Sequence, residues 1–308
     1  MQTILVTGAS GLLGANLVAR ARERGLEVVA AARRHRVKGP GIRFLVWPLE
    51  DMDAHGKLME ECRPQWVVHC AAWTDVDGCE SQPEAALRLN SMASGALAAA
   101  ADRIGAAFVY VSTDSVFDGA TGAYAEEADP HPVNAYAHSK LEGERSVRAA
   151  HPGALVVRTN IFGWNARKKQ SLAEWVLGKL RAGETVPGFR DVWFNPLHAA
   201  DLAGILLDLL ARDARGLVHA GSADTLSKYE FARAAAEVFG LNAELVAPAT
   251  LAGSPLRARR PLNTGLDVRR LSSWLGRPLP TIREGLGAMR EMETNGGLAR
   301  LHELIEGD

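Results

Sequence analysis

The sequence has few of the features that mark secreted, disulfide-linked or metal-binding proteins. Its 308 residues include only three cysteines, Cys62, Cys70 and Cys79. Their number is odd and their spacing fits neither a zinc site nor a disulfide framework, so we expect reduced thiols in the core. No cluster of ligand residues requires a metal. The N-terminal stretch MQTILVTGAS has no basic residue and only a short apolar run, which predicts neither a secretory signal nor a membrane span. We therefore expect a cytoplasmic location.

An excess of charge is also missing. The formal net charge at pH 7 is −1, which provides no broad electrostatic surface for nucleic acid or anionic membranes, and we expect neither as a partner. Hydrophobic residues make up 47% of the chain and charged residues 23%, a balance typical of folded globular proteins. A chain of this length has room for about two domains of ordinary size.

Short apolar, β-rich runs alternate with helical patterns through the first half of the chain. The runs cover residues 3–7, 26–32, 43–47, 66–72, 107–113 and 154–159. Helical stretches separate most of them, among them residues 12–24, which end at Gly25, and a long stretch that begins at Pro83. This alternation predicts an α/β fold with a doubly wound parallel sheet.

The alternation weakens after Gly163. We expect helices near residues 171–180, 199–211 and 228–240 and a strand at 217–221, in an irregular order. This part we assign largely to a second, smaller α/β domain. The first domain is predicted to comprise residues 1–163 plus about 196–221, and the second domain about 164–195 plus 222–308. No flexible linker separates them, so the cleft between the two is the expected small-molecule site.

A glycine-rich turn follows the first predicted strand. Residues 7–14 read TGASGLLG, with Gly8, Gly11 and Gly14 spaced as G-x-x-G-x-x-G at the start of a predicted helix. Glycines allow a tight turn and a close approach of the backbone to a pyrophosphate, which then lies at the positive end of the helix. A second strand completes a βαβ unit, and this context favours dinucleotide binding over an ordinary strand-to-helix connection.

A tyrosine and a lysine are four residues apart in NAYAHSK. On a helix Tyr136 and Lys140 would share one face, and the ammonium would lower the pKa of the phenol from about 10. The spacing alone also arises by chance. Here it follows the fifth predicted strand, at the carboxyl edge of the sheet, where ligands of open α/β folds bind.

Together these motifs resemble a known family. TGASGLLG, HCAAWTDVDGCE, YVSTDSVFDG, NAYAHSK and RRPLNTGLD are similar to the extended short-chain dehydrogenases/reductases of the dTDP-4-dehydrorhamnose reductase type. The resemblance covers nearly the whole chain. The regulatory subunit of methionine adenosyltransferase, a non-catalytic relative, shares much of the pattern, including the GLLG turn and the VHCAA strand.

The resemblance implies an NAD(P)H-dependent reduction of a 4-keto sugar carried on a nucleotide diphosphate. Tyr136 matches the family's catalytic tyrosine, which would act as general acid. Lys140 matches the lysine that binds the nicotinamide ribose, and Thr113 the hydroxyl that helps hold the substrate carbonyl. Asp114 matches the family's Ser-Thr-Asp sequence. Ser115 stands where the family usually has a tyrosine, so the shape of the sugar pocket stays open.

Several further positions carry two interpretations each. Asn90 matches a helix asparagine that supports the active site, and a buried amide bonded to backbone explains it almost as well. For Ala71 and Ala72, at the end of the fourth strand, we favour contact with the cofactor over core packing. Phe162 or Trp164 either walls the nicotinamide or sugar, or belongs to a structural aromatic cluster.

Two candidates lie late in the sequence. Asn195 belongs to a segment that precedes a helix in the manner of the family's substrate-side loop. Arg260, with its neighbours Arg257 and Arg259, would suit a nucleotide diphosphate, because guanidinium groups match phosphate geometry. An interdomain ion-pair face explains these arginines equally well.

A basic run follows the second strand, where an NAD-specific site would place an acidic residue. Arg33 and Arg34 there favour the 2′-phosphate of NADP, with NAD as the alternative cofactor; an exposed loop without a ligand is the other interpretation. The predicted cofactor contacts are Gly8, Ser10, Gly11, Leu12, Leu13, Arg33, Arg34, Leu49, Cys70, Ala71, Ala72, Asn90, Tyr136 and Lys140. The predicted substrate contacts are Asp114, Ser115, Phe162, Trp164, Asn195 and Arg260.

Other functions on the same scaffold remain open. Dehydratases of this superfamily usually carry an Asp-Glu pair after the strand-end threonine, and Ser115 argues against that chemistry. A nucleotide-sugar epimerase and a non-catalytic NADP-binding regulatory subunit are not excluded. The sequence defines neither the sugar nor the nucleotide base, and a homodimer is one possible assembly.

Overall fold

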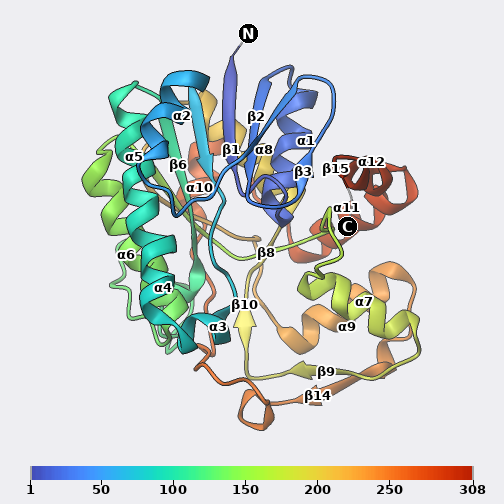
Figure 1. The fold of residues 1–308 in the computed structure, drawn as a ribbon. Coiled ribbons are helices and arrows are strands. Elements are labelled where there is room, and N and C mark those ends of the chain that lie inside the picture. The colour runs from blue at the N-terminus through green and yellow to red at the C-terminus, as the bar shows by residue number, and fades with distance from the viewer. Residues whose placement is uncertain (1, 307–308) are drawn as a thin grey trace.

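The computed structural model describes residues 2–306 and is built around a seven-stranded parallel sheet. Along the sheet the strand order is β12-β7-β6-β5-β1-β2-β4. From β1 the chain adds strands toward one edge of the sheet, and from β5 it adds them toward the other edge. The predicted α/β class with a doubly wound sheet is confirmed (Figure 1). The strands are β1 (Thr3–Thr7), β2 (Glu27–Ala32), β4 (Ile42–Val46), β5 (Trp66–His69), β6 (Ala107–Thr113), β7 (Leu155–Thr159) and β12 (Gly216–Ala220).

Helices cover both faces of the sheet because its strands bury side chains on both sides. Ile4 and Val6 of β1 belong to one apolar cluster, whereas Leu5 between them belongs to another, as the alternation along a strand requires. In Figure 1, α1 (Leu12–Glu23) and α8 (Ala199–Ala211) lie on one face and α2 (Ala54–Cys62), α5 (Ala93–Arg103) and α6 (Ala135–Ala150) on the other.

The long helical stretch after Pro83 is not one regular helix. It consists of α4 (Pro83–Leu87), a π-helical turn at Arg88–Met92, and α5, preceded by the short α3 (Val76–Ser81). The backbone carbonyl of Asn90 in this turn accepts hydrogen bonds from Tyr110 Oη at 2.8 Å and Ser94 Oγ at 3.0 Å. Because Tyr110, which bonds this turn, lies on a strand distant in the sequence, sequence periodicity alone does not reveal the π-helical turn.

Smaller elements lie beyond the carboxyl edge of the sheet (Figure 1). Two helices there begin with capping boxes, in which Ser171 pairs with Glu174 and Ser227 with Glu230. These two helices are α7 (Leu172–Arg181) and α9 (Lys228–Phe239), and α11 (Ile282–Thr294) packs against α9. Helix α10 (Arg269–Leu275) packs against β12, and α12 (Gly297–Glu303) contacts α11 and α1. The strand pairs are β9 (Val186–Phe189) with β14 (Val246–Ala249), β8 (Ile161–Phe162) with β11 (Leu197–His198), and β10 (Trp193–Phe194) with β13 (Leu226–Ser227). Short 3-10 helices occupy Asp114–Val116, Ala243–Leu245 and Leu251–Gly253.

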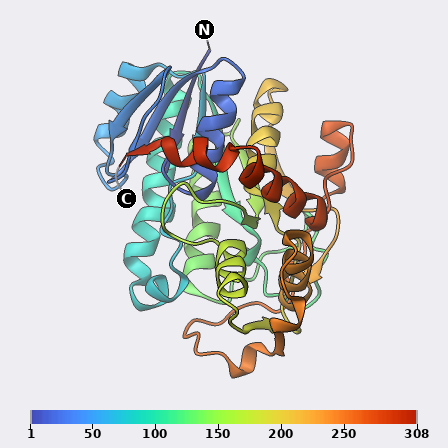
Figure 2. The ribbon, with the colours of Figure 1, turned by 90° about the vertical axis from the view of Figure 1, so that its right-hand side faces the viewer.

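The C-terminal segment returns to the N-terminal half of the fold. Strand β15 (Ile305–Glu306) pairs antiparallel with β3 (Arg36–Val37), and Lys38 N donates to Leu304 O at 2.7 Å. Figure 2 shows this segment crossing toward the first strands of the sheet. It thereby supports the basic run that follows β2. Within residues 2–306, no helix is both long and apolar enough to cross a membrane.

Helix α1 packs close to the sheet because Gly14 has no side chain. A Cβ atom there would lie 2.2 Å from Gly8 O and 2.8 Å from Ala9 Cα. Both neighbours are backbone atoms of the glycine turn, so neither moves without distorting it.

We therefore expect Gly14→Ala to lower the free energy of unfolding by about 2 kcal/mol or more, as overpacking does. Gly204→Ala is the matched control, because a Cβ there would meet only Arg24 Nη2 at 3.8 Å inside α8. That variant should be neutral or stabilised by about 0.5–1 kcal/mol through helix propensity. Urea unfolding followed by circular dichroism measures both. Equal stability of the two variants would contradict the packing argument.

Candidate functional site

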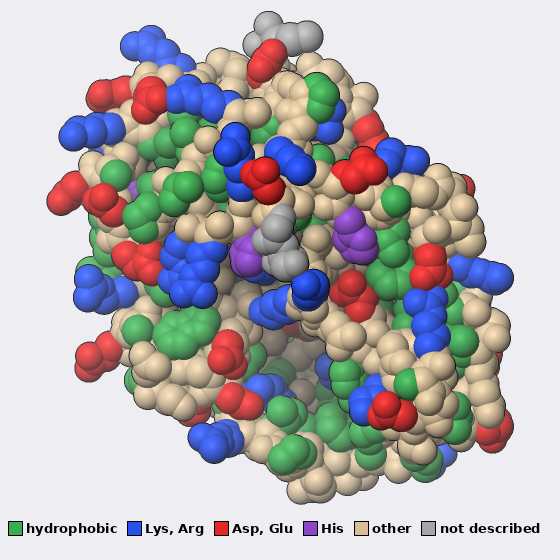
Figure 3. Space-filling model, turned by 45° about the vertical axis from the view of Figure 1, so that its right-hand side comes forward, with side chains coloured by type: hydrophobic (Ala, Val, Ile, Leu, Met, Phe, Trp, Pro, Cys, Tyr) green, Lys and Arg blue, Asp and Glu red, His purple; other side chains and the backbone are tan. Residues whose placement is uncertain are grey.

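A cavity of about 1010 Å³ opens at the carboxyl edge of the sheet. Figure 3 shows the hollow on this side of the molecule, with Lys and Arg side chains at its rim. The predicted residues that line it are Gly8, Ser10, Gly11, Leu12, Leu13, Arg33, Leu49, Cys70, Ala71, Ala72, Thr113, Asp114, Ser115, Tyr136 and Lys140. The glycine turn and the predicted catalytic residues therefore border one space.

The glycine turn forms one end of the cavity. Gly8 has a φ of +62°, and a Cβ atom there would lie 2.8 Å from Ala71 N at the end of β5. Gly11 immediately precedes helix α1 and provides no side-chain cap, and the first turn of the helix has no acidic residue. Unpaired N–H groups at the positive end of a helix suit a phosphate group.

A chain of buried polar groups fixes the end of β5. Thr7 Oγ1 accepts a hydrogen bond from Ala71 N at 3.2 Å and lies 2.7 Å from His69 Nδ1. His69 Nε2 lies 3.0 Å from Ser94 Oγ, which itself donates to a backbone carbonyl. Nε2 must therefore be the donating nitrogen, and Nδ1 accepts from Thr7. Burial, assisted by Lys140, lowers the pKa of His69 to about 3, which keeps the ring neutral.

Asn90 is fully buried and does not line the cavity, which corrects its prediction as a cofactor contact. Its amide acts as a clamp instead. Oδ1 accepts from Trp73 N at 2.8 Å, and Nδ2 donates to Trp73 O at 3.0 Å and to Ser139 Oγ at 2.9 Å. The loop after β5 is thereby held against helix α6, one residue before Lys140.

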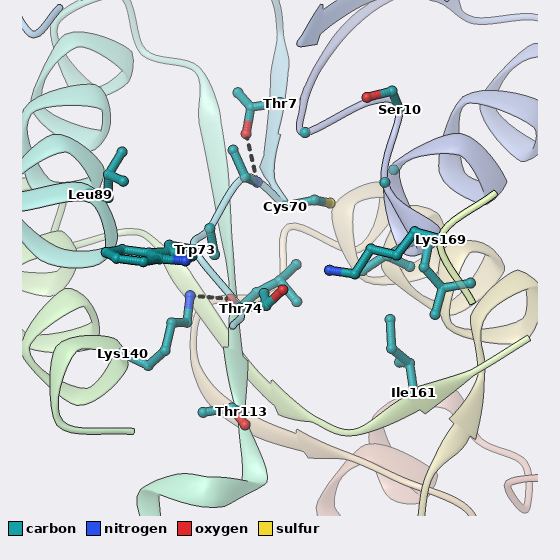
Figure 4. Close-up of a pocket in the computed structure, with 18 of the residues that line it drawn as sticks. Thr7, Ser10, Cys70, Trp73, Thr74, Leu89, Thr113, Lys140, Ile161 and Lys169 are labelled. Carbon is teal, nitrogen blue, oxygen red and sulfur yellow. Dashed lines mark hydrogen bonds between the residues drawn. The ribbon is translucent and has the colours of Figure 1, made fainter. Parts of the chain in front are cut away.

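Lys140 projects from α6 toward the cavity (Figure 4). Its ammonium donates to Val111 O at 2.8 Å and lies 3.9 Å from the centre of the Tyr110 ring. Burial lowers the pKa of Lys140 to about 7, although Glu144 one turn further along α6 favours the charged form. Glu144 itself is held by Arg158, whose Nη2 donates to it at 2.8 Å.

Tyr136 is partly buried at the start of the same helix. Burial raises the pKa of its phenol well above 10, and a hydrogen bond with Thr113 opposes the rise. The expectation that Lys140 lowers this pKa is not met in this structure, because burial raises the pKa and Lys140 is not among the groups that shift it. A phenol with a raised pKa stays protonated at neutral pH and is available as a proton donor.

Asp114 connects the end of β6 to other segments around the cavity. Its carboxylate accepts hydrogen bonds from Thr264 Oγ1 at 2.5 Å, Asn160 Nδ2 at 2.9 Å, and Thr113 Oγ1 and Ser115 Oγ at 3.2 Å each. Burial raises the pKa of Asp114, and these hydrogen bonds counteract the rise. Because both oxygens already accept hydrogen bonds from protein side chains, the carboxylate mainly holds these side chains in place and is less available to a ligand.

The basic run after β2 lies at the far end of the cavity. Arg33 lines it and approaches Glu50, with 3.5 Å between Nη1 and Oε1. Both side chains of this pair are about half exposed, so the pair is weak and leaves Arg33 free to turn toward an anion. Arg34 is exposed and does not line the cavity in this structure.

Four predicted substrate contacts are not brought to the cavity. Phe162 is 1% and Trp164 6% exposed, and both pack in the hydrophobic core, which corrects the expectation that one of them walls the cavity. Asn195 is 3% exposed, and its Nδ2 donates to backbone carbonyls of Ser222 and Leu266. Arg260 forms an ion pair with Asp77 at 3.1 Å. This contact agrees with the alternative interpretation of Arg260, that of an interdomain ion pair.

Other residues line the cavity without having been predicted. Trp73 and Thr74 follow the short strand β5, and Trp47 follows β4. Arg167 and Lys169 come from the loop that precedes α7 (Figure 4). The only signal for the latter two in the sequence is the basic run RKK, which is ordinarily a solvated surface. Within residues 2–306, no three His, Cys, Asp or Glu side chains are grouped so that they could hold a metal ion.

Comparison with known proteins identifies the family. A sequence profile of the RmlD substrate-binding domain matches residues 1–294. The chain belongs to this RmlD family. The resemblance to reductases of the dTDP-4-dehydrorhamnose type is thus confirmed. A probable low-salt glycan biosynthesis reductase of Haloferax volcanii is 37% identical over 291 residues, 92% of this chain and 96% of the relative. The β subunit of methionine adenosyltransferase 2 from Rattus norvegicus is 34% identical over 279 residues, 88% of this chain and 81% of the relative.

Solved structures share the RmlD fold. A dTDP-4-dehydrorhamnose reductase from Clostridium acetobutylicum superposes with a TM-score of 0.85 at 27% identity, covering 95% of this chain and all of that one. The corresponding enzyme from Bacillus anthracis, in complex with NADP, has a TM-score of 0.84 at 24% identity, with 94% and 99% coverage. MoeE5, in complex with UDP-glucuronic acid and NAD, has a TM-score of 0.78 at 26% identity, with 96% and 99% coverage. Structural relatives of this chain therefore bind NADP or NAD.

The lowered pKa of Lys140 predicts a pH dependence of stability. The folded protein releases the proton near pH 7, whereas the unfolded chain keeps it up to the ordinary pKa of 10.5. Between these values the unfolded state binds more protons, so a rise in pH favours the folded state. We expect the wild type to gain stability over Lys140→Met as pH rises from about 7 to 10. Urea unfolding at a series of pH values measures the difference, and a constant difference between the two curves would contradict a buried, lowered Lys140.

Proposed function

We propose that the protein is an NADPH-dependent reductase of a 4-keto-6-deoxy sugar carried on a nucleotide diphosphate. The observation that supports it most is the grouping of Thr113, Tyr136 and Lys140 on one wall of the cavity whose other end is the glycine turn. That arrangement puts a proton donor and a positive charge about where a dinucleotide on the turn would end. The names of the reductase relatives support a sugar substrate.

The side chains suit the protonation half of a carbonyl reduction. A bound nicotinamide would supply the hydride to the carbonyl carbon. Tyr136 gives its proton to the oxygen on which negative charge develops, and its raised pKa keeps that proton in place beforehand. Thr113 can turn its hydroxyl from Asp114 to the same oxygen. Lys140, in its protonated form, stabilises the phenolate that Tyr136 becomes.

Residues of this chain fit a phosphorylated dinucleotide. The uncapped start of α1 is suited to the diphosphate, and Arg33 and Arg34 to the 2′-phosphate of NADP. We propose Leu49, Cys70, Ala71 and Ala72 as the apolar and backbone wall of the same ligand. Burial raises the pKa of the Cys70 thiol to about 12, so this residue contributes a surface and no thiolate chemistry. We propose that Ser115 contacts the substrate.

The division into domains follows from the same proposal. Residues 1–163 and about 196–221 would hold the dinucleotide, and about 164–195 and 222–308 the sugar nucleotide. Contacts such as Asn134 Nδ2 to Arg259 O at 2.8 Å and Arg260 to Asp77 join the two parts beside Tyr136.

A non-catalytic, NADP-binding subunit is the second candidate. The 34% identity to the methionine adenosyltransferase 2 β subunit favours it, because that relative covers nearly the same length of chain. A nucleotide-sugar epimerase has no observation of its own in its favour. Cofactor oxidation separates the first two candidates, since only a reductase consumes NADPH when a keto sugar is added.

We expect the wild type to oxidise NADPH when a dTDP-4-keto-6-deoxy hexose is added, with the loss of absorbance at 340 nm as readout. Tyr136→Phe should reduce turnover by about 100-fold or more while leaving cofactor affinity nearly unchanged, because only the proton donor is lost. Lys140→Ala should damage both turnover and cofactor binding.

Two results would count against this assignment. If Tyr136→Phe keeps more than about a tenth of the wild-type turnover, Tyr136 is not the general acid. If the wild type binds NADPH and oxidises none with any 4-keto sugar nucleotide, the non-catalytic candidate replaces the reductase.

We also expect NADPH to bind at least about tenfold more tightly than NADH, or about 1.4 kcal/mol, because Arg33 and Arg34 form charge-assisted contacts with the 2′-phosphate. Titration of both cofactors against the wild type and an Arg33→Ala/Arg34→Ala double variant measures this preference. The double variant should lose NADPH affinity and keep NADH affinity. Equal affinities in the wild type, or equal losses in the variant, would contradict it.

A further inference from the structure

The loop between β8 and α7 forms a wall of the cavity. Arg167, Lys169, Gln170 and Ser171 all line it. In Figure 4 the Lys169 side chain extends from this loop into the cavity, across from the strand that carries Thr113. None of these residues lies in the glycine turn or in the Tyr-x-x-x-Lys motif, so the proposed function assigns them no role.

Both ends of this loop are anchored. Asn165 N donates to Glu174 Oε1 at 3.0 Å, and Arg167 N to Asn165 Oδ1 at 3.1 Å. At the other end Ser171 caps α7 and its Oγ donates to Gly163 O at 2.7 Å. These hydrogen bonds fix the backbone at both ends of the loop, so the loop stays beside the cavity, with Lys169 exposed at its rim.

The charges of this wall lack acidic counterparts inside the cavity. Its only acidic lining residues, within the described residues 2–306, are Glu50 and Asp114. Glu50 faces Arg33, and Asp114 is occupied by four side-chain donors. Arg167 Nε is buried and has no hydrogen-bond partner. A buried donor without a partner is unfavourable, and an anionic ligand would relieve it.

The glycine turn contributes to the same cavity. Ser10, Gly11 and Leu12 at the uncapped start of α1 line it together with the loop. The backbone amides at the helix start and the positive charges of the loop therefore border the same cavity. A diphosphate, with two phosphate groups to share, fits such a pair of walls better than a single phosphate does.

We propose that Arg167 and Lys169 bind the diphosphate of a nucleotide ligand in this cavity, together with the start of α1. This inference rests on the proposed function, because the expected ligand is the diphosphate bridge of NADPH. A nucleotide sugar carries the same chemical group, and the experiment below distinguishes the two sources.

The test measures binding of three ligands by isothermal titration calorimetry to the full-length wild type and variants. 2′-Phospho-ADP-ribose has the cofactor's diphosphate without its nicotinamide, NADPH has both, and dTDP represents the sugar nucleotide. Lys169→Ala and Arg167→Gln should each weaken NADPH and 2′-phospho-ADP-ribose by about fivefold, the usual size of a partly exposed ion pair. Lys169→Arg should retain most of the affinity.

Lys168→Ala is the matched control, because it removes the same charge from the same loop at a residue that does not line the cavity. It should change affinity less than twofold at about 0.15 M salt, where the distant field of one charge is largely screened. Thermal unfolding of every variant confirms that the fold is intact.

The outcomes separate as follows. Loss of affinity for both 2′-phospho-ADP-ribose and NADPH, with dTDP unchanged, supports the cofactor's diphosphate. Loss of affinity for dTDP alone supports a diphosphate site that serves the sugar nucleotide. Unchanged affinity for all three ligands, or an equal loss in Lys168→Ala, overturns the inference. If the wild type reduces no keto sugar but Lys169→Ala still binds the dinucleotide more weakly, the proposed reductase function is wrong and the proposed diphosphate site is supported.

Discussion

The buried carboxylate of Asp114 is the constraint around which the reactive end of the cavity is assembled. It is 1% exposed and accepts hydrogen bonds from Thr113 on β6, from Asn160 beyond β7 and from Thr264, 150 residues later in the chain. A carboxylate in such a place is unfavourable unless each oxygen is satisfied. Its partners therefore have to be brought together from three separate segments, and two of them, Thr113 and Asn160, also line the cavity. The direction of the Thr113 hydroxyl, and with it the geometry next to Tyr136, follows from this one group.

Desolvation also sets the protonation of the groups proposed to react. Burial favours the neutral forms of both Tyr136 and Lys140, raising the pKa of the first and lowering that of the second to about 7. The phenol therefore keeps the proton that it would donate. The pKa of the lysine lies near neutral pH, so a small change in its surroundings would change its charge. Glu144, held by Arg158, pulls it toward the charged form. Buried polar groups that do not line the cavity thus influence the protonation of a side chain that does.

At the other end of the cavity, where we propose that an anionic ligand binds, the lining comes from distant parts of the chain. The start of α1, the basic run after β2 and the loop before α7 all contribute, and only two acidic side chains line the cavity within residues 2–306. Relatives with a reductase name and with a methionine adenosyltransferase name share this fold. The proposed nucleotide-binding end is therefore compatible with either role, and we expect the side chains around Tyr136 to decide whether turnover is possible.

The sequence by itself determined the sheet, the glycine turn and the Tyr136–Lys140 helix. Each depends on local patterns: alternating apolar runs, glycine spacing and an i to i+4 pair. Only the tertiary structure decided which side chains reach the cavity. Phe162 and Trp164 follow a buried strand, and packing turned them into the core, whereas Lys169 in a polar loop was turned inward. The π turn at Asn90 and the raised pKa of Tyr136 likewise depend on partners and burial contributed by distant segments. Orientation and desolvation are properties of the assembled fold, and no local pattern encodes them.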